Sequence, residues 1–193
     1  MLGAAGGTFA VAGHANAGAK PADGKTFRLT REIPVEDGFD LAVAGGGPAG
    51  VAAAVSAARA GAKVLLFEAT GCLGGMGTSG LVCSFDPMGN GKENLVRGIM
   101  LEIVTEMARR GFVPYKQMPE QLAAFHHWTH FNPEGYKTVL DEFVQKAGVE
   151  VRFFTKLIDA DADRAARTVR SVVVNDIEGY HCLSARMFID ATG

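Results

Sequence analysis

The six residues Gly45-Gly46-Gly47-Pro48-Ala49-Gly50 are the first part of the sequence whose spacing could do chemistry. They satisfy the pattern G-x-G-x-x-G, in which Gly45 permits a tight turn and Gly50 lets a helix pack closely on a strand. Gly47 carries no Cβ, so a pyrophosphate can approach the backbone there. The pattern alone is weak evidence, but it becomes specific where it follows a strand and opens a helix.

Both of these elements are expected around the glycines. Residues 39–44 form a short apolar run that is typical of a buried strand, and the alanine-rich residues 48–60 favour a helix that stops at Gly61. Residues 63–68 read as a second buried strand. Together they make a βαβ unit of ordinary size, in which the positive end of the helix dipole would face the phosphates.

Glu68 ends the second predicted strand, 18 residues after Gly50. A carboxylate at this place can accept hydrogen bonds from the hydroxyls of an adenosine ribose, and its charge disfavours a 2′-phosphate. Strand, helix, second strand and terminal acid therefore predict a dinucleotide site. They leave open whether the dinucleotide is a nicotinamide or a flavin cofactor.

Two further features favour flavin. The pair Gly74-Gly75 follows Glu68 by six residues, and the predicted strand Met187-Phe188-Ile189-Asp190 ends in Ala191-Thr192-Gly193. With these motifs, residues 39–193 resemble the FAD-dependent oxidoreductases of the glutathione-reductase-like superfamily. They are most similar to its heterodisulfide-reductase-A-like and fumarate-reductase-like flavoproteins. The resemblance implies that this sequence is the N-terminal portion of such a protein, since the Gly-Asp pair that normally follows A-T-G is not reached.

The resemblance also implies a set of residues that bind FAD. The fingerprint would hold the pyrophosphate, Glu68 the ribose, the glycine pair the flank of the cofactor, and Thr78 and Ser79 would lie toward the flavin. The full set is Gly45, Gly47, Pro48, Ala49, Gly50, Glu68, Gly74, Gly75, Thr78, Ser79, Ala191, Thr192 and Gly193. Some flavoproteins of this class link FAD covalently through a histidine soon after the double glycine. Residues 69–91 contain no histidine, so we expect FAD to be bound without a covalent link. The catalytic residues and the substrate remain unassigned.

The rest of the chain predicts an α/β fold in which a parallel Rossmann-type sheet is interrupted by a helical insertion, residues 69–148. Within it, apolar residues from Leu95 to Met107 at helical spacing favour a helix over Glu93–Arg110, and Asn132 is a typical cap for the next helix. Three short runs, 157–160, 168–174 and 180–184, predict an antiparallel β-meander before a separate last strand.

Two groups of residues could suggest other chemistry. His126 and His130 are four residues apart, but His127 stands where a H-E-x-x-H zinc motif needs glutamate, and no nearby Cys or carboxylate pair completes a metal shell. We expect no metal, and a polar turn with Trp128 packed inward; contact of a histidine with flavin or substrate is the alternative. The three cysteines include no C-x-x-C pair, so an iron–sulfur cluster, which some relatives carry, would need residues outside this sequence.

Composition excludes several classes of protein. The chain has 193 residues, is 48% hydrophobic and 21% charged, and carries a net charge of −2. This hydrophobicity is too high for a disordered chain, and the charge balance argues against nucleic acid as a partner. No long uncharged apolar run suits a mature membrane span. The expected partners are a small-molecule substrate and an electron donor or acceptor; the oligomeric state cannot be read from the sequence.

The N-terminal residues divide into two segments. Residues 1–19 lack Lys and Arg and contain Ala15-Asn16-Ala17, an A-x-A pattern of the kind signal peptidase cuts. We interpret them as the remnant of an export signal, and residues 20–38 as a linker to the domain at 39–193. A plain Ala/Gly-rich N-terminus on a cytoplasmic protein is the alternative.

Three functions stay open: a flavoenzyme, an NAD-dependent dehydrogenase-type domain, and a truncated product without catalysis.

Overall fold

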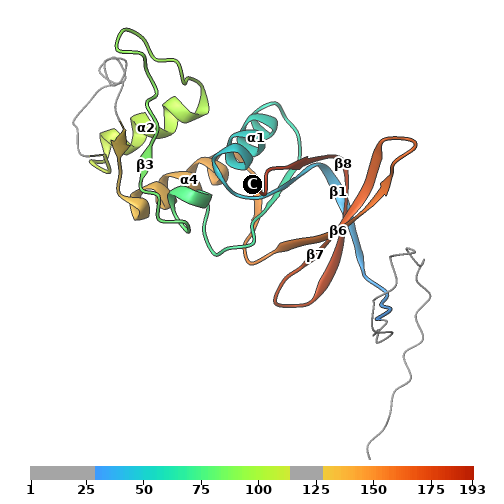
Figure 1. Cartoon of the computed structure of the whole chain (residues 1–193). Helices are drawn as coiled ribbons and strands as arrows, with labels where there is room; N and C mark the ends of the chain where they lie inside the picture. Colours follow the sequence, from blue (N-terminus) through green and yellow to red (C-terminus); the bar gives the residue numbers. More distant parts are fainter. Residues whose placement is uncertain (1–28, 114–127) are drawn as a thin grey trace, which may run out of the picture. The chain divides into compact units, whose positions relative to one another are not determined.

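The structure is a computed structural model that describes residues 29–113 and 128–193. The chain divides into two compact units, Met1–Pro34 and Val35–Gly193. In the first unit, the described residues 29–34 form neither helix nor strand. The second unit contains the helices and strands described below, which Figure 1 shows in sequence colours.

A six-stranded sheet is the frame of the second unit, with the strand order β5-β2-β1-β8-β7-β6. The pairs β5–β2, β2–β1 and β1–β8 are parallel, whereas β8–β7 and β7–β6 are antiparallel. The predicted α/β fold, with a largely parallel Rossmann-type sheet and a β-meander, is thereby confirmed. The strands are β1 (Val35–Ala44), β2 (Val64–Phe67), β5 (Glu150–Arg152), β6 (Lys156–Asp163), β7 (Thr168–Asn175) and β8 (Tyr180–Asp190).

Strands β1 and β2 both lie inside the sheet. Nearly all of their apolar side chains are buried, as in parallel sheets that are covered on both faces. Their register pairs Leu41 with Val64 and Ala44 with Phe67. The two strands therefore end at the same level. This register brings the glycine turn after β1 next to Glu68, which follows β2.

The start of β1 and the extent of β8 differ from the prediction. β1 begins at Val35 rather than at residue 39, and its register with β8 shifts near Gly38, whose φ is +92°. β8 was expected as two strands, 180–184 and 187–190, but it is one continuous strand. Its first part, residues 180–184, pairs with β7, while residues 182–190 pair with β1. The polar residues between the two apolar runs do not end the strand because backbone pairing with β1 continues through them.

Helix α1 (Pro48–Arg59) connects β1 to β2 and packs on them through the small buried residues Gly50, Val51, Ala54 and Val55. Proline at the first helical position has the right φ and lacks only an N–H that the helix does not use. The helix ends at Arg59, with Ala60 as its C-cap, and Gly61 follows with a φ of +92°. The predicted start and the glycine stop are confirmed, and the predicted end at residue 60 is one residue too late.

The insertion contains the 3₁₀ turn η1 (Gly75–Gly77), helix α2 (Ile99–Arg109), helix α4 (Pro133–Ala147) and a two-stranded ribbon of β3 (Ser84–Phe85) and β4 (Thr129–His130). The prediction that α2 starts at Glu93 is wrong. Gly98 adopts φ +66° and ψ −141°, which no helix contains, and Leu95 is 62% exposed in the preceding loop. Leu95 lies at helical spacing from the apolar residues of α2 by chance, although the helix does not extend across Gly98.

Helix α4 begins as predicted, since the Asn132 side chain accepts a hydrogen bond from the amide of Gly135. It ends at Gly148 in the left-handed conformation. Its Tyr136 packs edge-on against Phe85 and Phe131. These three rings form an aromatic contact inside a core whose other buried side chains are aliphatic.

The expected turn with an inward Trp128 is wrong. Residues 129–130 are a strand, and alternation along it leaves Trp128 59% exposed while Thr129 and Phe131 are buried. His126 and His127 lie outside the described residues. Among the described residues, no group of three or more His, Cys, Asp and Glu side chains could hold a metal ion. Nor does any described helix have both the length and the hydropathy of a membrane crossing.

Candidate functional site

The glycine turn joins β1 to α1 and brings three separate parts of the chain together. Gly45 has a φ of +98°, which favours glycine, and its amide donates to the carbonyl of Phe67 at the end of β2 (2.8 Å). A Cβ on Gly45 would collide with the backbone of Ala191, and one on Gly50 would collide with the carbonyl oxygen of Gly45. These two glycines are therefore required by the packing of the turn.

Gly47 has a different role. It stands at the N-cap of α1 with φ −67° and ψ 178°, a conformation that any residue adopts, and a Cβ added there would meet nothing within 4 Å. Pro48 and Ala49 beside it are exposed. No side chain caps α1, and its first turn contains no acidic residue. The positive end of the helix therefore faces open space, which is the arrangement that binds phosphate groups.

Glu68 is 8% exposed and lies beside the turn. One carboxylate oxygen accepts a hydrogen bond from the amide of Gly46 (2.6 Å), and the other accepts one from the amide of Thr70 (2.7 Å). Each oxygen of an ionised carboxylate can accept a second hydrogen bond. Glu68 is thus fixed in place by the backbone and keeps the capacity to accept bonds from ribose hydroxyls.

Gly46 was not singled out from the sequence, because it occupies the unspecified position of G-x-G-x-x-G. A Cβ on Gly46 would lie 2.6 Å from the Leu73 side chain and 3.1 Å from Cβ of Glu68. Its carbonyl accepts a hydrogen bond from the amide of Gly74 (2.8 Å). Gly46 therefore links the fingerprint, the acid and the double glycine. The run of three glycines was the signal that could have revealed it.

The glycine pair lies directly against the fingerprint. Gly74 and Gly75 have φ values of +106° and +53°, and a Cβ on Gly75 would be 3.2 Å from Cα of Gly47. The pair thus forms one wall beside the open N-terminus of α1. Two motifs about 27 residues apart in sequence make a single surface.

Thr78 and Ser79 follow this wall and differ in exposure. Thr78 is 1% exposed, and its hydroxyl donates to the carbonyl of Leu73 (2.6 Å). Ser79 is exposed, with its hydroxyl donating to that of Thr70 (3.1 Å) and lying 3.2 Å from the sulfur of Cys72. The Thr78 side chain therefore fixes the loop, while Ser79 and the backbone present the surface.

The segment Ala191-Thr192-Gly193 completes the neighbourhood of the turn. The amide of Ala191 donates to the carbonyl of Ala44 (2.8 Å), which keeps it beside Gly45. Thr192 donates its amide and its hydroxyl to one oxygen of Asp190 (3.1 and 2.8 Å), and these bonds hold the pKa of that carboxyl below its usual value. All the predicted cofactor-binding motifs thus meet at the carboxyl ends of β1, β2 and β8, where ligands bind in open α/β sheets.

Comparison with known proteins identifies this arrangement. A family model described as FAD dependent oxidoreductase matches residues 40–193. The chain belongs to this family. No curated protein matches the sequence. The fingerprint alone left open whether the cofactor is a flavin or a nicotinamide dinucleotide. FAD is the cofactor of the family, so the cofactor is the flavin.

Several solved structures share the fold. THI4 of Thermovibrio ammonificans has a TM-score of 0.55 at 20% identity, over 81% of this chain and 58% of its own. The myxobacterial FAD-dependent halogenase CndH has a TM-score of 0.54 at 26% sequence identity, and the match covers 83% of this chain and 38% of CndH. A flavocytochrome c3 fumarate reductase in its open conformation has a TM-score of 0.55 at 17% identity, and the match covers 83% of this chain and 34% of the reductase. This chain therefore spans between about a third and three-fifths of their lengths.

The residues present fit FAD. The backbone at Gly47 is open, since an added Cβ would meet nothing within 4 Å, and the uncapped end of α1 supplies a positive field. The anchored carboxylate of Glu68 lies beside it for the ribose. No described residue stands out as a general acid or base for the reaction.

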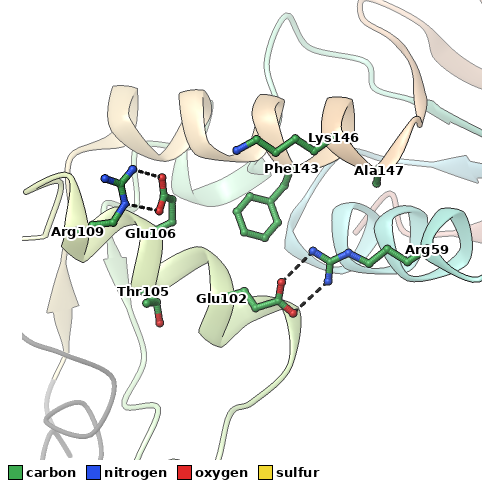
Figure 2. Close-up of a pocket in the computed structure, with 8 residues that line it drawn as sticks. All are labelled: Arg59, Glu102, Thr105, Glu106, Arg109, Phe143, Lys146 and Ala147. Carbon is green, nitrogen blue, oxygen red and sulfur yellow. Dashed lines mark hydrogen bonds and ion pairs between the residues drawn. The ribbon is translucent and has the colours of Figure 1, made fainter.

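A separate pocket of about 530 Å³ lies between α1, α2 and α4 (Figure 2). Four of the charged side chains that line it bond to one another. Arg59 makes two hydrogen bonds with Glu102, and Arg109 makes two with Glu106. Arg59 is at the end of α1 opposite to the glycine turn, about 18 Å away at 1.5 Å per residue. This pocket is therefore not part of the flavoprotein site.

Proposed function

We propose that this chain holds FAD, without a covalent bond, for an oxidoreductase that acts on a small molecule. The observation that carries the proposal is the pair of hydrogen bonds on Gly46, from its amide to Glu68 and from Gly74 to its carbonyl. These bonds unite three motifs around one open helix N-terminus. FAD would supply the redox chemistry there by accepting and releasing electrons.

The chain's own residues bind and orient the cofactor. The amides at the start of α1 and the helix dipole attract the pyrophosphate, and the flat wall of Gly74 and Gly75 lets it lie against the backbone. Glu68 accepts hydrogen bonds from the ribose and repels a phosphate at the 2′ position. Because its carboxylate is already held by two amides, little rotamer freedom is lost when the ribose binds.

A substitution at Gly47 tests this proposal without disturbing the fold. A Cβ at Gly47 meets nothing within 4 Å and the backbone conformation suits any residue, but the methyl groups of valine would stand where the phosphates are proposed to bind. We expect wild-type protein to quench the fluorescence of added FAD, and Gly47→Val to lose this while unfolding at the same temperature. Ser56→Val, on an exposed position of the same helix, is the control. Equal FAD binding by Gly47→Val and wild type would refute the site.

The non-covalent link has its own test. Acid precipitation of the yellow protein should release flavin into the supernatant, because residues 69–91 offer no histidine for a bond. Flavin that stays with the pellet would contradict this.

The colour of the purified protein tests the alternative functions. Colourless protein that binds NAD would support the nicotinamide alternative, and colourless protein that binds neither cofactor would support a product without catalysis. An iron–sulfur cluster would add a broad visible absorbance that acid destroys.

We also propose that residues 1–19 are the remnant of an export signal and that the protein works outside the cytoplasm. The Ala15-Asn16-Ala17 pattern supports this, and these residues lie outside the described ones. In cells that express the full reading frame, the mature protein should be found in the extracytoplasmic fraction and begin after Ala17. A cytoplasmic protein that retains residues 1–19 would favour the alternative.

A further inference from the structure

Asp141 is a carboxylate of helix α4 in an unusual setting. It reaches solvent, yet it makes no hydrogen bond or ion pair with any residue that the structure describes. Partial burial raises the pKa of its carboxyl above the ordinary value of 3.8. Hydrogen bonds instead lower the pKa values of Glu106, Glu142 and Asp190. Asp141 is therefore a charge that the described part of the chain leaves uncompensated.

The setting of Asp141 is a pocket of about 330 Å³ between α4 and β5. The other side chains that line it are mostly apolar: Val144, Gln145, Val149, Val151 and Phe153. Val144 and Val149 are buried, and Val151 and Phe153 pack against the same core. The pocket thus combines apolar walls with one carboxylate, and the described residues that line it include no basic side chain.

The fold explains why these residues meet. Gly148 ends α4 in the left-handed conformation and turns the chain directly into β5. The three pocket residues of α4 share one face of the helix, because the second and third follow the first by three and four positions. The three that follow Gly148 alternate along the chain and so lie on one side of the strand. None of the predicted cofactor-binding residues lines this pocket, so it is separate from the dinucleotide site.

We propose that this pocket binds a compact organic cation, in which an ammonium group is attached to a small apolar body. The ammonium group would donate to the carboxylate of Asp141 and to the amide oxygen of Gln145, whose side chain has no partner among the described residues. The apolar body would cover the valine side chains and Phe153. Ligand pockets typically measure about 300–1,000 Å³, so this one suits a body of only a few carbon atoms.

The charges of the site select against other ligands. An anion would be repelled by Asp141, and a neutral ligand would leave the carboxylate without a counter-charge. No existing ion pair has to break for a cation to bind. The pocket in Figure 2 differs in this respect, because Arg59 and Glu102 already bond to each other there.

Three probes with the same branched carbon skeleton test the proposal on the full chain. At neutral pH isopentylamine is a cation, isopentanol is neutral and isovalerate is an anion. The backbone amide signals of Val149, Val151 and Phe153 in isotope-labelled protein report occupancy of the pocket. We expect the amine to bind about tenfold more tightly than the alcohol, because a charge-assisted hydrogen bond is stronger than a neutral one. Equal affinities of amine and alcohol, or tighter binding of isovalerate, would overturn the proposal.

Asp141→Asn separates the charge of the site from its shape. Asparagine is of similar size and Asp141 has no partner to lose, so the unfolding temperature should hardly change. The Kd for isopentanol should stay the same, whereas isopentylamine should lose its tenfold advantage. Asp159→Asn, at an exposed carboxylate on β6, is the control and should keep that advantage. Undiminished binding of the amine by Asp141→Asn would show that this carboxylate does not hold it.

Val151→Ala tests the apolar wall. Removing methyl groups from the wall should weaken isopentylamine and isopentanol by the same factor, so that the ratio of their Kd values is kept. Unchanged Kd values for both probes would place their binding elsewhere and refute the pocket. These measurements do not depend on whether the chain binds FAD, so the cation site and the proposed function stand or fall separately.

Discussion

Gly50 lies so close to Gly45 that a Cβ on the helix residue would overlap the carbonyl oxygen of the turn residue. This contact sets how near α1 approaches the end of β1, and with it the position of the helix N-terminus that faces the phosphates. Both atoms involved belong to the backbone, so neither can move aside as a side chain would. The closeness of helix and turn is thus a property that only glycine permits at position 50.

Gly50→Ala should therefore destabilise the protein, whereas Gly47→Ala should not. Overpacking costs typically about 1–3 kcal/mol, and the upper end is expected at Gly50 because the obstacle is rigid. Gly47→Ala adds the same methyl group, on a neighbouring position, where no atom lies within 4 Å. Urea unfolding of the two variants without ligand measures the difference. Equal unfolding free energies would contradict the packing described here.

Glu68 should contribute to stability before any ligand binds. Its carboxylate accepts the amide hydrogens of Gly46 and Thr70 in a nearly buried place. Glu68→Gln would turn an NH₂ group toward one of these amides and leave it unsatisfied, at a cost of about 1–3 kcal/mol. Thermal unfolding of the ligand-free variant tests this, with Glu150→Gln on the exposed edge strand as the control. The same variant should bind ADP more weakly, because the ribose loses an ionised acceptor.

Acid should weaken the contact between α2 and α4. Hydrogen bonds from Arg109, and then Arg110, lower the pKa of Glu106 to about 2, and Arg110 lowers that of Glu142 to about 2. Both pKa values are below the ordinary value of 4.5, so the folded state binds fewer protons than the unfolded state. Their stabilising effect is therefore full above about pH 4.5 and is lost as the pH falls toward 2.

Arg110→Met tests this dependence because Arg110 bonds both Glu106 and Glu142. Urea unfolding at a series of pH values between 2 and 7 should show a steeper loss of stability below pH 4.5 in wild type than in the variant. Arg170→Met, which breaks an exposed pair with Asp161 at the β6–β7 hairpin, is the matched control. Parallel curves for wild type and Arg110→Met would refute the assignment.

The sequence could predict the βαβ unit because each of its signals is local. Apolar runs, the alanine-rich helix and the stop at Gly61 depend on neighbours in the chain, and the glycine fingerprint and Glu68 follow from them. Features that depend on distant residues were missed. Gly46 needs glycine because of the Leu73 side chain, which is more than 20 residues away in the sequence.

The wrong boundaries have several causes. Helical spacing suggested that α2 includes Leu95, but the backbone of Gly98 breaks the helix at a place that spacing does not report. Trp128 was expected inside because of its size, although alternation along β4 turns it outward. The continuity of β8 depends on pairing with β1, which comes some 150 residues earlier. Of these three differences, only the continuity of β8 depends on a distant part of the chain.

Thr78 illustrates how a residue of the predicted site can serve the loop rather than the ligand. Its hydroxyl donates to the carbonyl of Leu73, and its methyl group fills the space that a Cβ on Gly74 would need. Thr78→Val keeps the shape but leaves the carbonyl of Leu73 without this buried donor, so we expect a loss of about 1–2 kcal/mol in unfolding free energy. Thr78→Ser should restore the hydrogen bond and recover part of the stability. Ser79→Ala, at the exposed neighbour, should cost almost nothing in the ligand-free protein, and a stability loss at Ser79 larger than at Thr78 would reverse the roles assigned to them.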